Sequence, residues 1–315
     1  MEFNKDFTII GIDGGGTHTR GILLRDGKIV AESKAGSTRI GAVGVGESCE
    51  RTLNVILDLC EQASIESSEV DAVVVGLAGV WLEEEKQRSA RLLKTLGRGH
   101  NFNFSDLIVT SDAEIALRGA FEGGNGIITI IGTGSIALGN PSGQDLVRCG
   151  GWGIELDDEG SGAWIGREGL TAVVRAIDGR GKKTALTDII ANAYPSINIE
   201  QPRTIVKAYS EGAFQYHSLS PFVMQCAVDG DPICLDIIDR SATHLLELPL
   251  ALVPSFKEKQ VEVALMGGIV ENDTLLADKL KEKINKNKSL KLVDARSTAL
   301  IGALAMGSEL IAEMG

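Results

Sequence analysis

Apolar residues along the chain gather in short runs, and these runs alternate with stretches of helical spacing. The first run, Ile9 to Ile12, ends at Asp13 and three glycines, and a second run, Ile22 to Leu24, follows soon after. Short apolar runs bounded by turn residues predict buried strands. We therefore expect residues 9–24 to form a strand, a glycine turn and a second strand.

The rest of the first half alternates strands with helices. After the opening hairpin, apolar residues recur either in short runs or at the spacing of one helix face. The expected elements are strands over residues 29–33, 70–77 and 107–110 and helices over residues 46–63, 83–96 and 114–121. The order is three strands, helix, strand, helix, strand, helix.

The same pattern then starts again, because residues 126–139 repeat the apolar run, glycine turn and apolar run. A repeated order of elements predicts two related α/β halves. The other segments expected in the second half are a glycine-rich acidic stretch over 147–169, helices over 170–252, a strand over 259–265, a helix over 275–284, a short strand over 290–293 and a last helix over 297–314.

Composition narrows the class of protein. The chain has 315 residues, is 43% hydrophobic and carries a formal net charge of −12. This charge argues against a nucleic-acid or acidic-membrane partner. No apolar stretch reaches membrane-spanning length and the first residues do not resemble a signal peptide, so we expect a cytoplasmic protein. The oligomeric state stays open, with a homodimer as one option.

The cysteines predict no metal or disulfide framework. Their number is odd, their spacing lacks any CxxC pair, and they form no zinc-type cluster with the four histidines. Most lie in apolar helical stretches, which is typical of small buried thiols in a reduced protein. The five residues are Cys49, Cys60, Cys149, Cys226 and Cys234.

The first glycine turn is a candidate anion-binding loop. Gly14, Gly15 and Gly16 have no Cβ to keep a ligand from the backbone, so successive N–H groups can point at a phosphate. Asp13, at the end of the first strand, is suited to hold a hydrated Mg²⁺. Because strand follows where a helix should begin, this is neither a Walker loop nor a Rossmann fingerprint. Hydroxyl donors are expected from Thr17 and Thr19.

Further glycine turns follow other predicted strands. Ligands in open α/β sheets bind beyond the carboxyl ends of the strands, so an ordered set of such turns predicts one ligand site. Two phosphate-type hairpins from two halves would clamp one polyphosphate, and the last pair would let an adenosine approach the backbone. These further turns are Ala78-Gly79, Gly132-Thr133-Gly134-Ser135 and Gly267-Gly268.

Asp112 is the candidate catalytic acid or base. It follows a predicted strand at the junction between the two halves. A carboxylate there can accept a proton from a substrate hydroxyl while the γ-phosphate is attacked in line. Asp is also a preferred residue at a helix N-cap, and spacing alone leaves that interpretation open.

A second acidic segment runs from Gly150 to Gly162 around Trp152. A tryptophan flanked by glycines suggests an apolar platform beside open backbone, on which a sugar ring can stack while carboxylates bind its hydroxyls. The alternative is a mobile acidic loop with a packing tryptophan.

Taken in order, these motifs resemble the BadF/BadG/BcrA/BcrD ATPase family, and within it the N-acetylglucosamine and glucosamine kinases. The resemblance covers essentially the whole chain, and its most specific part is the segment with Gly150-Gly151-Trp152-Gly153 and Asp158-Glu159-Gly160-Ser161. It implies two RNase-H-like α/β domains of the actin/hexokinase/Hsp70 type around an ATP cleft. The implied domains are residues 1–117 and 118–296, with a last helix over 297–315 that packs back on the first.

The resemblance also implies roles for single residues. Asp112 would be the general base for the 6-hydroxyl of an amino sugar, phosphorylated from ATP with Mg²⁺. Phosphate or adenosine contacts would come from residues 14–17, Thr19, Gly132, Thr133, Gly134, Gly267 and Gly268. The sugar would contact Ser37, Thr38, Ala78, Gly79, Ser135, Gly151, Trp152, Gly153 and Asp158.

Two positions depart from the family pattern. Many relatives have Asn after a Ser-Thr pair in the sugar-contacting loop, whereas here Arg39 follows Ser37-Thr38. Relatives usually have Gly before Asp-Glu-Gly-Ser, whereas this chain has Asp157. An additional acid favours a cationic sugar such as glucosamine if it faces the substrate, and has no such effect if it points to solvent.

Two other functions remain as alternatives. An ATPase activator of a radical dehydratase or aryl-CoA reductase would carry an iron–sulfur ligand just before the second phosphate turn, where this chain has Ile130-Ile131-Gly132. A non-catalytic sugar sensor of the same fold would normally carry a basic DNA-binding segment, and nothing basic enough precedes Phe7.

Overall fold

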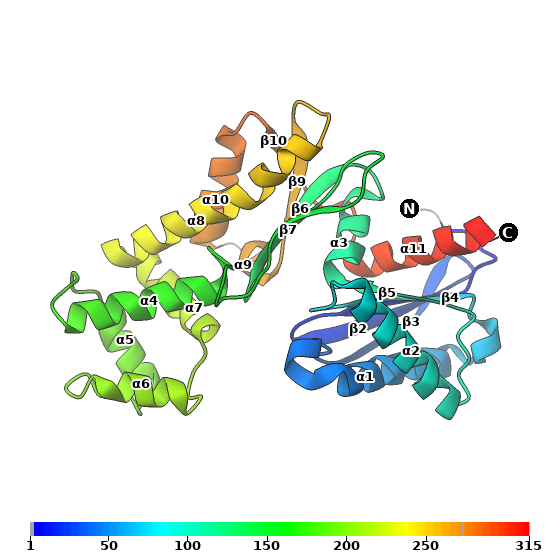
Figure 1. The fold of residues 1–315 in the computed structure, drawn as a ribbon, viewed down its shortest axis with the longest axis horizontal. Helices are drawn as coiled ribbons and strands as arrows, with labels where there is room; N and C mark the ends of the chain where they lie inside the picture. The colour runs from blue at the N-terminus through cyan, green and yellow to red at the C-terminus, as the bar shows by residue number, and fades with distance from the viewer. Residues whose placement is uncertain (1–2, 273, 315) are drawn as a thin grey trace. The chain divides into compact units, whose positions relative to one another are not determined.

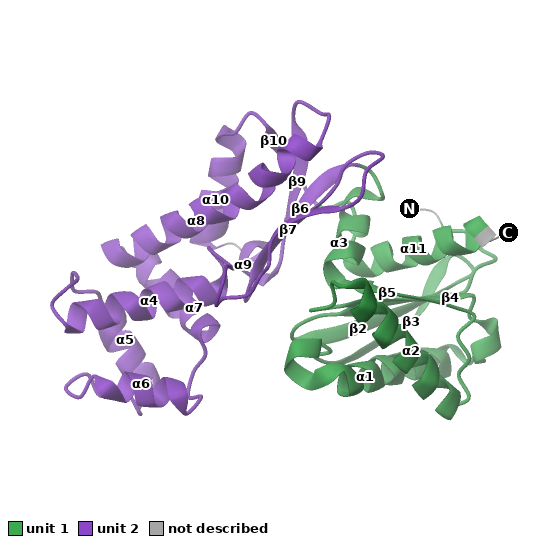
Figure 2. Cartoon of the chain, in the orientation of Figure 1, with its two compact units in different colours: residues 1–124, 295–315 green, residues 125–294 purple. Residues whose placement is uncertain are grey.

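The structure is a computed structural model that describes residues 3–272 and 274–314. The chain divides into two compact units (Figure 2). Unit 1 contains the described residues up to Gly124 and those from Ala295 onward, and unit 2 contains Asn125–Asp294. The division falls after Gly124 and not after residue 117 as expected, because helix α3 (Asp112–Phe121) continues past that point.

Unit 1 is built on a mixed five-stranded sheet. Its order is β3-β2-β1-β4-β5, in which β1 pairs antiparallel with β2 and parallel with β4, and β4 pairs parallel with β5. The opening hairpin therefore lies in mid-sheet. The strands are β1 (Ile9–Gly14), β2 (His18–Arg25), β3 (Lys28–Gly36), β4 (Ala72–Leu77) and β5 (Asp106–Ser111).

Helices cover both faces of this sheet (Figure 1). Side chains alternate along β1, so that Ile10 and Ile12 pack against α1 and α2 while Ile9 packs with Leu304 of α11. The strands are therefore apolar on both faces, as their continuous apolar runs predicted. The helices are α1 (Ile40–Ala63), the 3₁₀ turn η1 (Ser67–Glu69), α2 (Glu83–Gly99), α3 and α11 (Ala299–Met314).

Unit 2 repeats the topology of unit 1. Its sheet has the order β10-β9-β6-β7-β8, which is the order of the first sheet read from the other end. The expected repeat of two related α/β halves is thus confirmed. The strands are β6 (Gly126–Ile131), β7 (Ser135–Asn140), β8 (Val147–Gly150), β9 (Val261–Met266) and β10 (Leu290–Leu292).

Most of unit 2's helices lie between β8 and β9, as the sequence predicted. They bury one large apolar core with the strands, in which Trp164, Val223 and Leu245 are inaccessible or nearly so. The helices are α4 (Gly162–Ile177), α5 (Leu186–Ala193), α6 (Arg203–Ser210), α7 (Tyr216–Val228), α8 (Pro232–Leu252), the 3₁₀ turn η2 (Val253–Ser255), α9 (Gly268–Glu271) and α10 (Leu275–Lys286).

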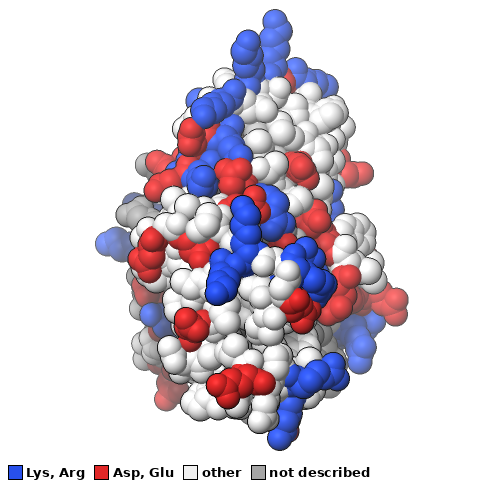
Figure 3. All heavy atoms as spheres, turned by 90° about the vertical axis from the view of Figure 1, so that its left-hand side faces the viewer, with Lys and Arg blue, Asp and Glu red and all other residues white. Residues whose placement is uncertain are grey.

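The surface and the cysteines agree with the composition. On the face drawn in Figure 3, Lys and Arg are interspersed with Asp and Glu. Four of the five cysteines are buried and all five are free thiols. Within the described part of the chain, no helix combines the length and the apolarity needed to cross a bilayer.

The contact between α11 and α3 depends on two glycines. A Cβ on Gly302 would collide with the carbonyl oxygen of Ile115, and a Cβ on Gly119 would collide with that of Thr298. Both colliding atoms belong to the backbone, which cannot move aside as a side chain can. The two helices therefore lie in close contact, which the small residues of the last helix predicted.

We predict that Gly302→Ala destabilises unit 1 by about 1–3 kcal/mol, the usual cost of overpacking. The measurement is the midpoint of thermal unfolding. Gly46→Ala is the matched control, because Gly46 lies inside α1 with open space around it and should gain up to about 1 kcal/mol from helix propensity. Equal stability of Gly302→Ala and the wild type would contradict this account.

Candidate active site

Three parallel strands of unit 1 end at the same level. Asp13 of β1 lies opposite Gly76 of β4, which lies opposite Thr110 of β5. The residues that follow these strands are therefore brought to one edge of the sheet. They are the glycine turn after Asp13, the turn Ala78-Gly79 and the side chain of Asp112, and they form the candidate site of unit 1.

The first glycine turn is tightly closed. The Gly15 N–H donates to the His18 carbonyl at 3.1 Å. A Cβ on Gly14 would lie 2.8 Å from the Gly76 carbonyl oxygen, so this glycine is needed for packing on β4. Gly16 and Thr17 are exposed beyond the strand ends. These two residues, with Gly15, are the part of the turn that can contact a phosphate.

Asp13 has one oxygen engaged and is suited to a hydrated cation. Its Oδ2 accepts a 2.7 Å ion pair from the guanidinium of Arg20, the residue paired with it across the hairpin. The Asp13 carboxylate also lies near enough to Asp112 to raise the pKa of that side chain. Two neighbouring carboxylates fit Mg²⁺, which binds oxygen ligands and retains several waters.

The loop after β3 is anchored to the turn by buried hydroxyls. The Thr19 hydroxyl donates to the Gly36 carbonyl and its oxygen is hydrogen-bonded to the Thr38 hydroxyl, each at 2.9 Å, and both threonines are fully buried. Their hydroxyls thus hold the loop to the hairpin, which differs from the expected phosphate and sugar contacts. Ser37 is partly exposed, with its hydroxyl 3.5 Å from the Gly15 carbonyl.

The Ala78-Gly79 turn completes this edge. The Ala78 N–H donates to the Gly14 carbonyl at 2.8 Å, and the Ala78 carbonyl accepts from Ile40 at 3.3 Å. Gly79 is exposed and has a left-handed backbone with φ of 85°. The turn therefore presents open backbone next to the phosphate-type loop.

Asp112 is the first residue of α3 and does not cap it. The cap is Ser111, whose hydroxyl accepts a 3.1 Å hydrogen bond from the Glu114 N–H. The interpretation of Asp112 as N-cap is thus wrong. The spacing Ser-x-x-Glu at 111–114 is the signal of a capping box and points to Ser111.

The Asp112 carboxyl has a perturbed acidity. Burial raises its pKa from the usual 3.8 to about 6, and the Asp13 carboxylate adds to the rise, while the Arg39 guanidinium acts in the opposite direction. Its Oδ1 accepts from the Ala113 N–H at 3.0 Å. Strongly shifted carboxyls with a charged neighbour are typical of functional sites.

Unit 2 contains the second glycine hairpin, between β6 and β7. The Gly162 and Ala163 N–H groups, at the start of α4, donate to the carbonyls of Gly132 and Thr133 at 2.9 and 3.0 Å. The helix start thus fixes the turn, and the Thr133 side chain stays exposed. The turn therefore has an exposed hydroxyl that a ligand can contact.

Ser135 and Asp158 join this hairpin to the acidic segment. The Ser135 N–H donates to Asp158 Oδ1 at 3.3 Å, and its buried hydroxyl donates to the Glu159 carbonyl at 3.0 Å. A Cβ on Gly134 would lie 2.6 Å from Asp158 Oδ2, so the glycine admits this carboxylate. Asp158 therefore lies against the phosphate-type turn, and the Ser135 hydroxyl is already engaged within the protein.

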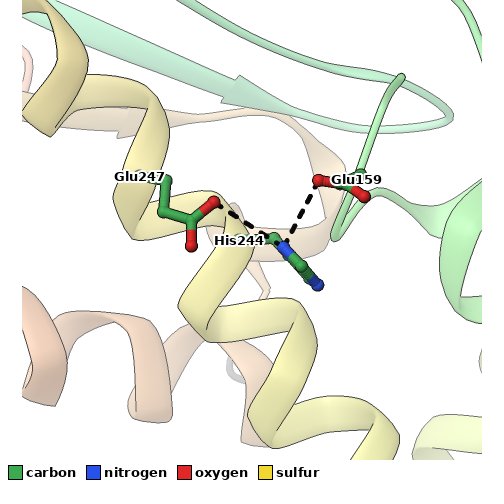
Figure 4. Close-up of side chains that lie close together, drawn as sticks. All are labelled: Glu159, His244 and Glu247. Carbon is green, nitrogen blue, oxygen red and sulfur yellow. Dashed lines mark ion pairs between the residues drawn. The ribbon is translucent and has the colours of Figure 1, made fainter. Parts of the chain in front are cut away.

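The three consecutive acids point to three different partners. Asp157 Oδ2 accepts from the Trp152 N–H at 3.3 Å. Glu159 lies 3.4 Å from Nδ1 of His244, which is also 3.7 Å from Glu247 (Figure 4). Asp157 thus stabilises the loop and is not a free acid facing solvent. The histidine contact was missed because α8 is remote in sequence and a lone histidine carries no signal.

The Trp152 segment presents an apolar ring to solvent. Gly150, Gly151 and Gly153 all have φ between 74° and 92°, a left-handed conformation that favours glycine. Trp152 is 66% exposed, and the Arg148 guanidinium lies 4.5 Å from its ring centroid. The ring is therefore available to a ligand, which fits the predicted sugar platform.

The last glycine pair follows β9, beside β6. Ile130 of β6 lies opposite Met266 of β9. Gly267 has φ of 100°, and a Cβ there would collide with the backbone of Ile131. Open space surrounds Gly268, the first residue of α9. The backbone here can approach a flat ligand closely, as expected for an adenosine contact.

Comparison with known proteins identifies the class. The profile of the BadF/BadG/BcrA/BcrD ATPase family matches residues 10–307, so the chain belongs to this family. The resemblance of its motifs is thereby confirmed.

Three relatives are similar over nearly their whole length. The N-acetylmuramic acid/N-acetylglucosamine kinase of Clostridium acetobutylicum is 30% identical, covering 94% of this chain and 96% of its own. The glucosamine kinase of Vibrio cholerae is 28% identical, covering 94% of each. A solved structure from Chromobacterium violaceum, assigned as an N-acetylglucosamine kinase, is 26% identical with a TM-score of 0.75, covering 96% of this chain and 99% of its own.

The raised pKa predicts that Asp112→Asn stabilises the protein at about pH 8 by about 1–3 kcal/mol. Because the folded pKa of about 6 lies above the unfolded value of 3.8, stability is lost as pH rises between these two values, and the difference between variant and wild type should approach zero near about pH 3. Thermal unfolding at both pH values measures this. Asp106→Asn, at the opposite end of β5, is the control. A difference independent of pH would contradict the assignment.

Proposed function

We propose that this protein transfers the γ-phosphoryl group of ATP to the 6-hydroxyl of an amino sugar, N-acetylglucosamine or glucosamine, with Asp112 as general base. The observation that carries the proposal is the position of Asp112, which follows β5 at the same sheet edge as the glycine turn after β1, with β4 between the two strands. A carboxylate next to a phosphate-type loop has the geometry for activating a hydroxyl toward a bound phosphate.

The acidity of Asp112 supports this role. A base with a pKa of about 6 is mostly ionised at neutral pH and is still basic enough to share a proton with a sugar hydroxyl. Asp112 is free for this task because Ser111 caps the helix.

Each unit offers its own glycine turn for phosphates. The exposed backbone of Gly15 and Gly16 with Thr17, and that of Gly132 with Thr133, would donate hydrogen bonds to them. Asp13 would hold Mg²⁺ through water, and that ion would neutralise charge on the phosphate oxygens. Adenosine would lie against Gly267 and Gly268.

The sugar is assigned to residues that the structure leaves accessible. In unit 2 these are the exposed Trp152 ring, the backbone of Gly151 and Gly153, and the Asp158 carboxylate. In unit 1 the candidates are Ser37 and Gly79. Support for an amino sugar comes from the relatives, which are named as kinases of N-acetylmuramic acid, N-acetylglucosamine and glucosamine.

The iron–sulfur alternative has little support in the side chains. Cys226 and Cys234 are buried within α7 and α8, with the pKa of each thiol raised by burial. Thiols in such surroundings do not provide the exposed thiolates that a cluster shared between subunits requires.

We predict that Asp112→Asn lowers the sugar-dependent rate about 10²–10⁴-fold, the usual contribution of a general base. Coupled detection of ADP release with N-acetylglucosamine and glucosamine measures it, with Asp106→Asn as the matched control. The wild-type kcat/KM should fall below about pH 6 as Asp112 becomes protonated.

Two outcomes would contradict the proposal. Full activity of Asp112→Asn would remove the base assignment. ADP release that does not depend on any sugar would show an ATPase and not a sugar kinase.

A further inference from the structure

Arg39 occupies a fixed position between the loops of unit 1. Its N–H donates to the Ser37 hydroxyl at 3.2 Å, and its carbonyl accepts from Ala42 and Val43 at the start of α1. The next residue, Ile40, donates to the Ala78 carbonyl. The backbone at Arg39 is therefore held against the same sheet edge that presents Asp112.

The side chain of Arg39 extends along this edge. It is exposed, and its Cδ lies 3.9 Å from the place where a Cβ on Gly16 would be. Its charge also acts on Asp112, since it lowers the pKa of that carboxyl. The guanidinium is thus near both the phosphate-type turn and the proposed base.

Arg39 differs from the neighbouring arginines in having no anionic partner. Arg20 is paired with Asp13 at 2.7 Å, and Arg51 contacts Glu47 and the Ser37 carbonyl, both at 2.7 Å. Over residues 3–272 and 274–314, no carboxylate lies within 4.0 Å of the Arg39 guanidinium. Its planar set of N–H donors is free to bind a ligand.

The charge and the paired N–H donors of a free guanidinium determine which ligands it binds. Arginine binds carboxylates through two parallel hydrogen bonds, and it repels a cationic amine. Because the Arg39 charge acts on Asp112, a sugar whose hydroxyl is hydrogen-bonded to Asp112 would bring its other ring substituents toward Arg39. N-acetylmuramic acid carries a carboxylate on a lactyl ether, and the relative from C. acetobutylicum is named for acting on both this sugar and N-acetylglucosamine.

We infer that Arg39 binds a carboxylate on the acceptor sugar, so that the substrate class of this site includes acidic N-acetylated amino sugars. The inference rests on the proposed kinase function. It names Arg39 as a specificity residue, and it places cationic glucosamine as the least favoured acceptor.

The test compares kcat/KM for N-acetylmuramic acid and N-acetylglucosamine in the wild type and in three variants. Arg39→Gln should lower the ratio of the two values about 10- to 100-fold, the effect of losing a charge-assisted pair. Arg39→Lys should lower it less, because charge is kept while the two-fold geometry is lost. Arg51→Gln, which removes a charge from α1 beside the same loop, should leave the ratio unchanged.

The ratio of the two kcat/KM values distinguishes carboxylate binding by Arg39 from any other effect of this side chain on the reaction. Any effect of Arg39 on Asp112 acidity or on the phosphates of ATP changes both sugars equally and cancels. An Arg39→Gln ratio equal to that of the wild type, or no turnover of N-acetylmuramic acid beside good turnover of N-acetylglucosamine, overturns the inference alone. If the wild type phosphorylates no amino sugar, both the proposed kinase function and the inference about Arg39 are wrong.

Discussion

The candidate site depends on three parallel strands ending at one level. Asp13, Gly76 and Thr110 are in register across β1, β4 and β5, and the absence of a Cβ on Gly14 avoids a collision with the Gly76 carbonyl. A shift of one residue would turn every side chain to the other face of the sheet. The two helix layers that bury both faces exclude such a shift, so packing far from the edge fixes where Asp112 and the glycine turn lie.

Unit 2 also holds its glycine turn in a fixed position, but with different residues. Its hairpin is fixed by the start of α4, which donates to Gly132 and Thr133, and by Asp158, which lies against Gly134. In unit 1 the buried hydroxyls of Thr19 and Thr38 hold the loop after β3 to the hairpin. Both units thus use buried hydrogen bonds to hold an exposed turn. The exposed turn and Asp112 lie at the same sheet edge, and this position lowers stability. Burial and the Asp13 charge raise the pKa of Asp112, so its ionised form reduces the free energy of unfolding at neutral pH.

The sequence alone predicted the elements whose formation depends on the local spacing of apolar residues. The strands around both glycine turns and the repeated order of elements followed from apolar periodicity. Tertiary contacts explain what was missed. Thr19 and Thr38 looked like ligand donors, but burial engages them within the protein. Helix α1 begins at Ile40 and continues across a kink at Gly44, whereas the apolar spacing predicted a start at Gly46. The contact of Glu159 with His244 joins segments remote in sequence, and no periodicity reports such a pair.

The central claim is that the sugar hydroxyl placed at Asp112 is the one on C6. The most direct measurement is a proton–phosphorus correlation NMR spectrum of the product formed from N-acetylglucosamine and ATP. The account predicts a correlation between the phosphorus and the two protons on C6. A correlation to the anomeric proton, or a phosphorus signal from inorganic phosphate alone, would contradict it.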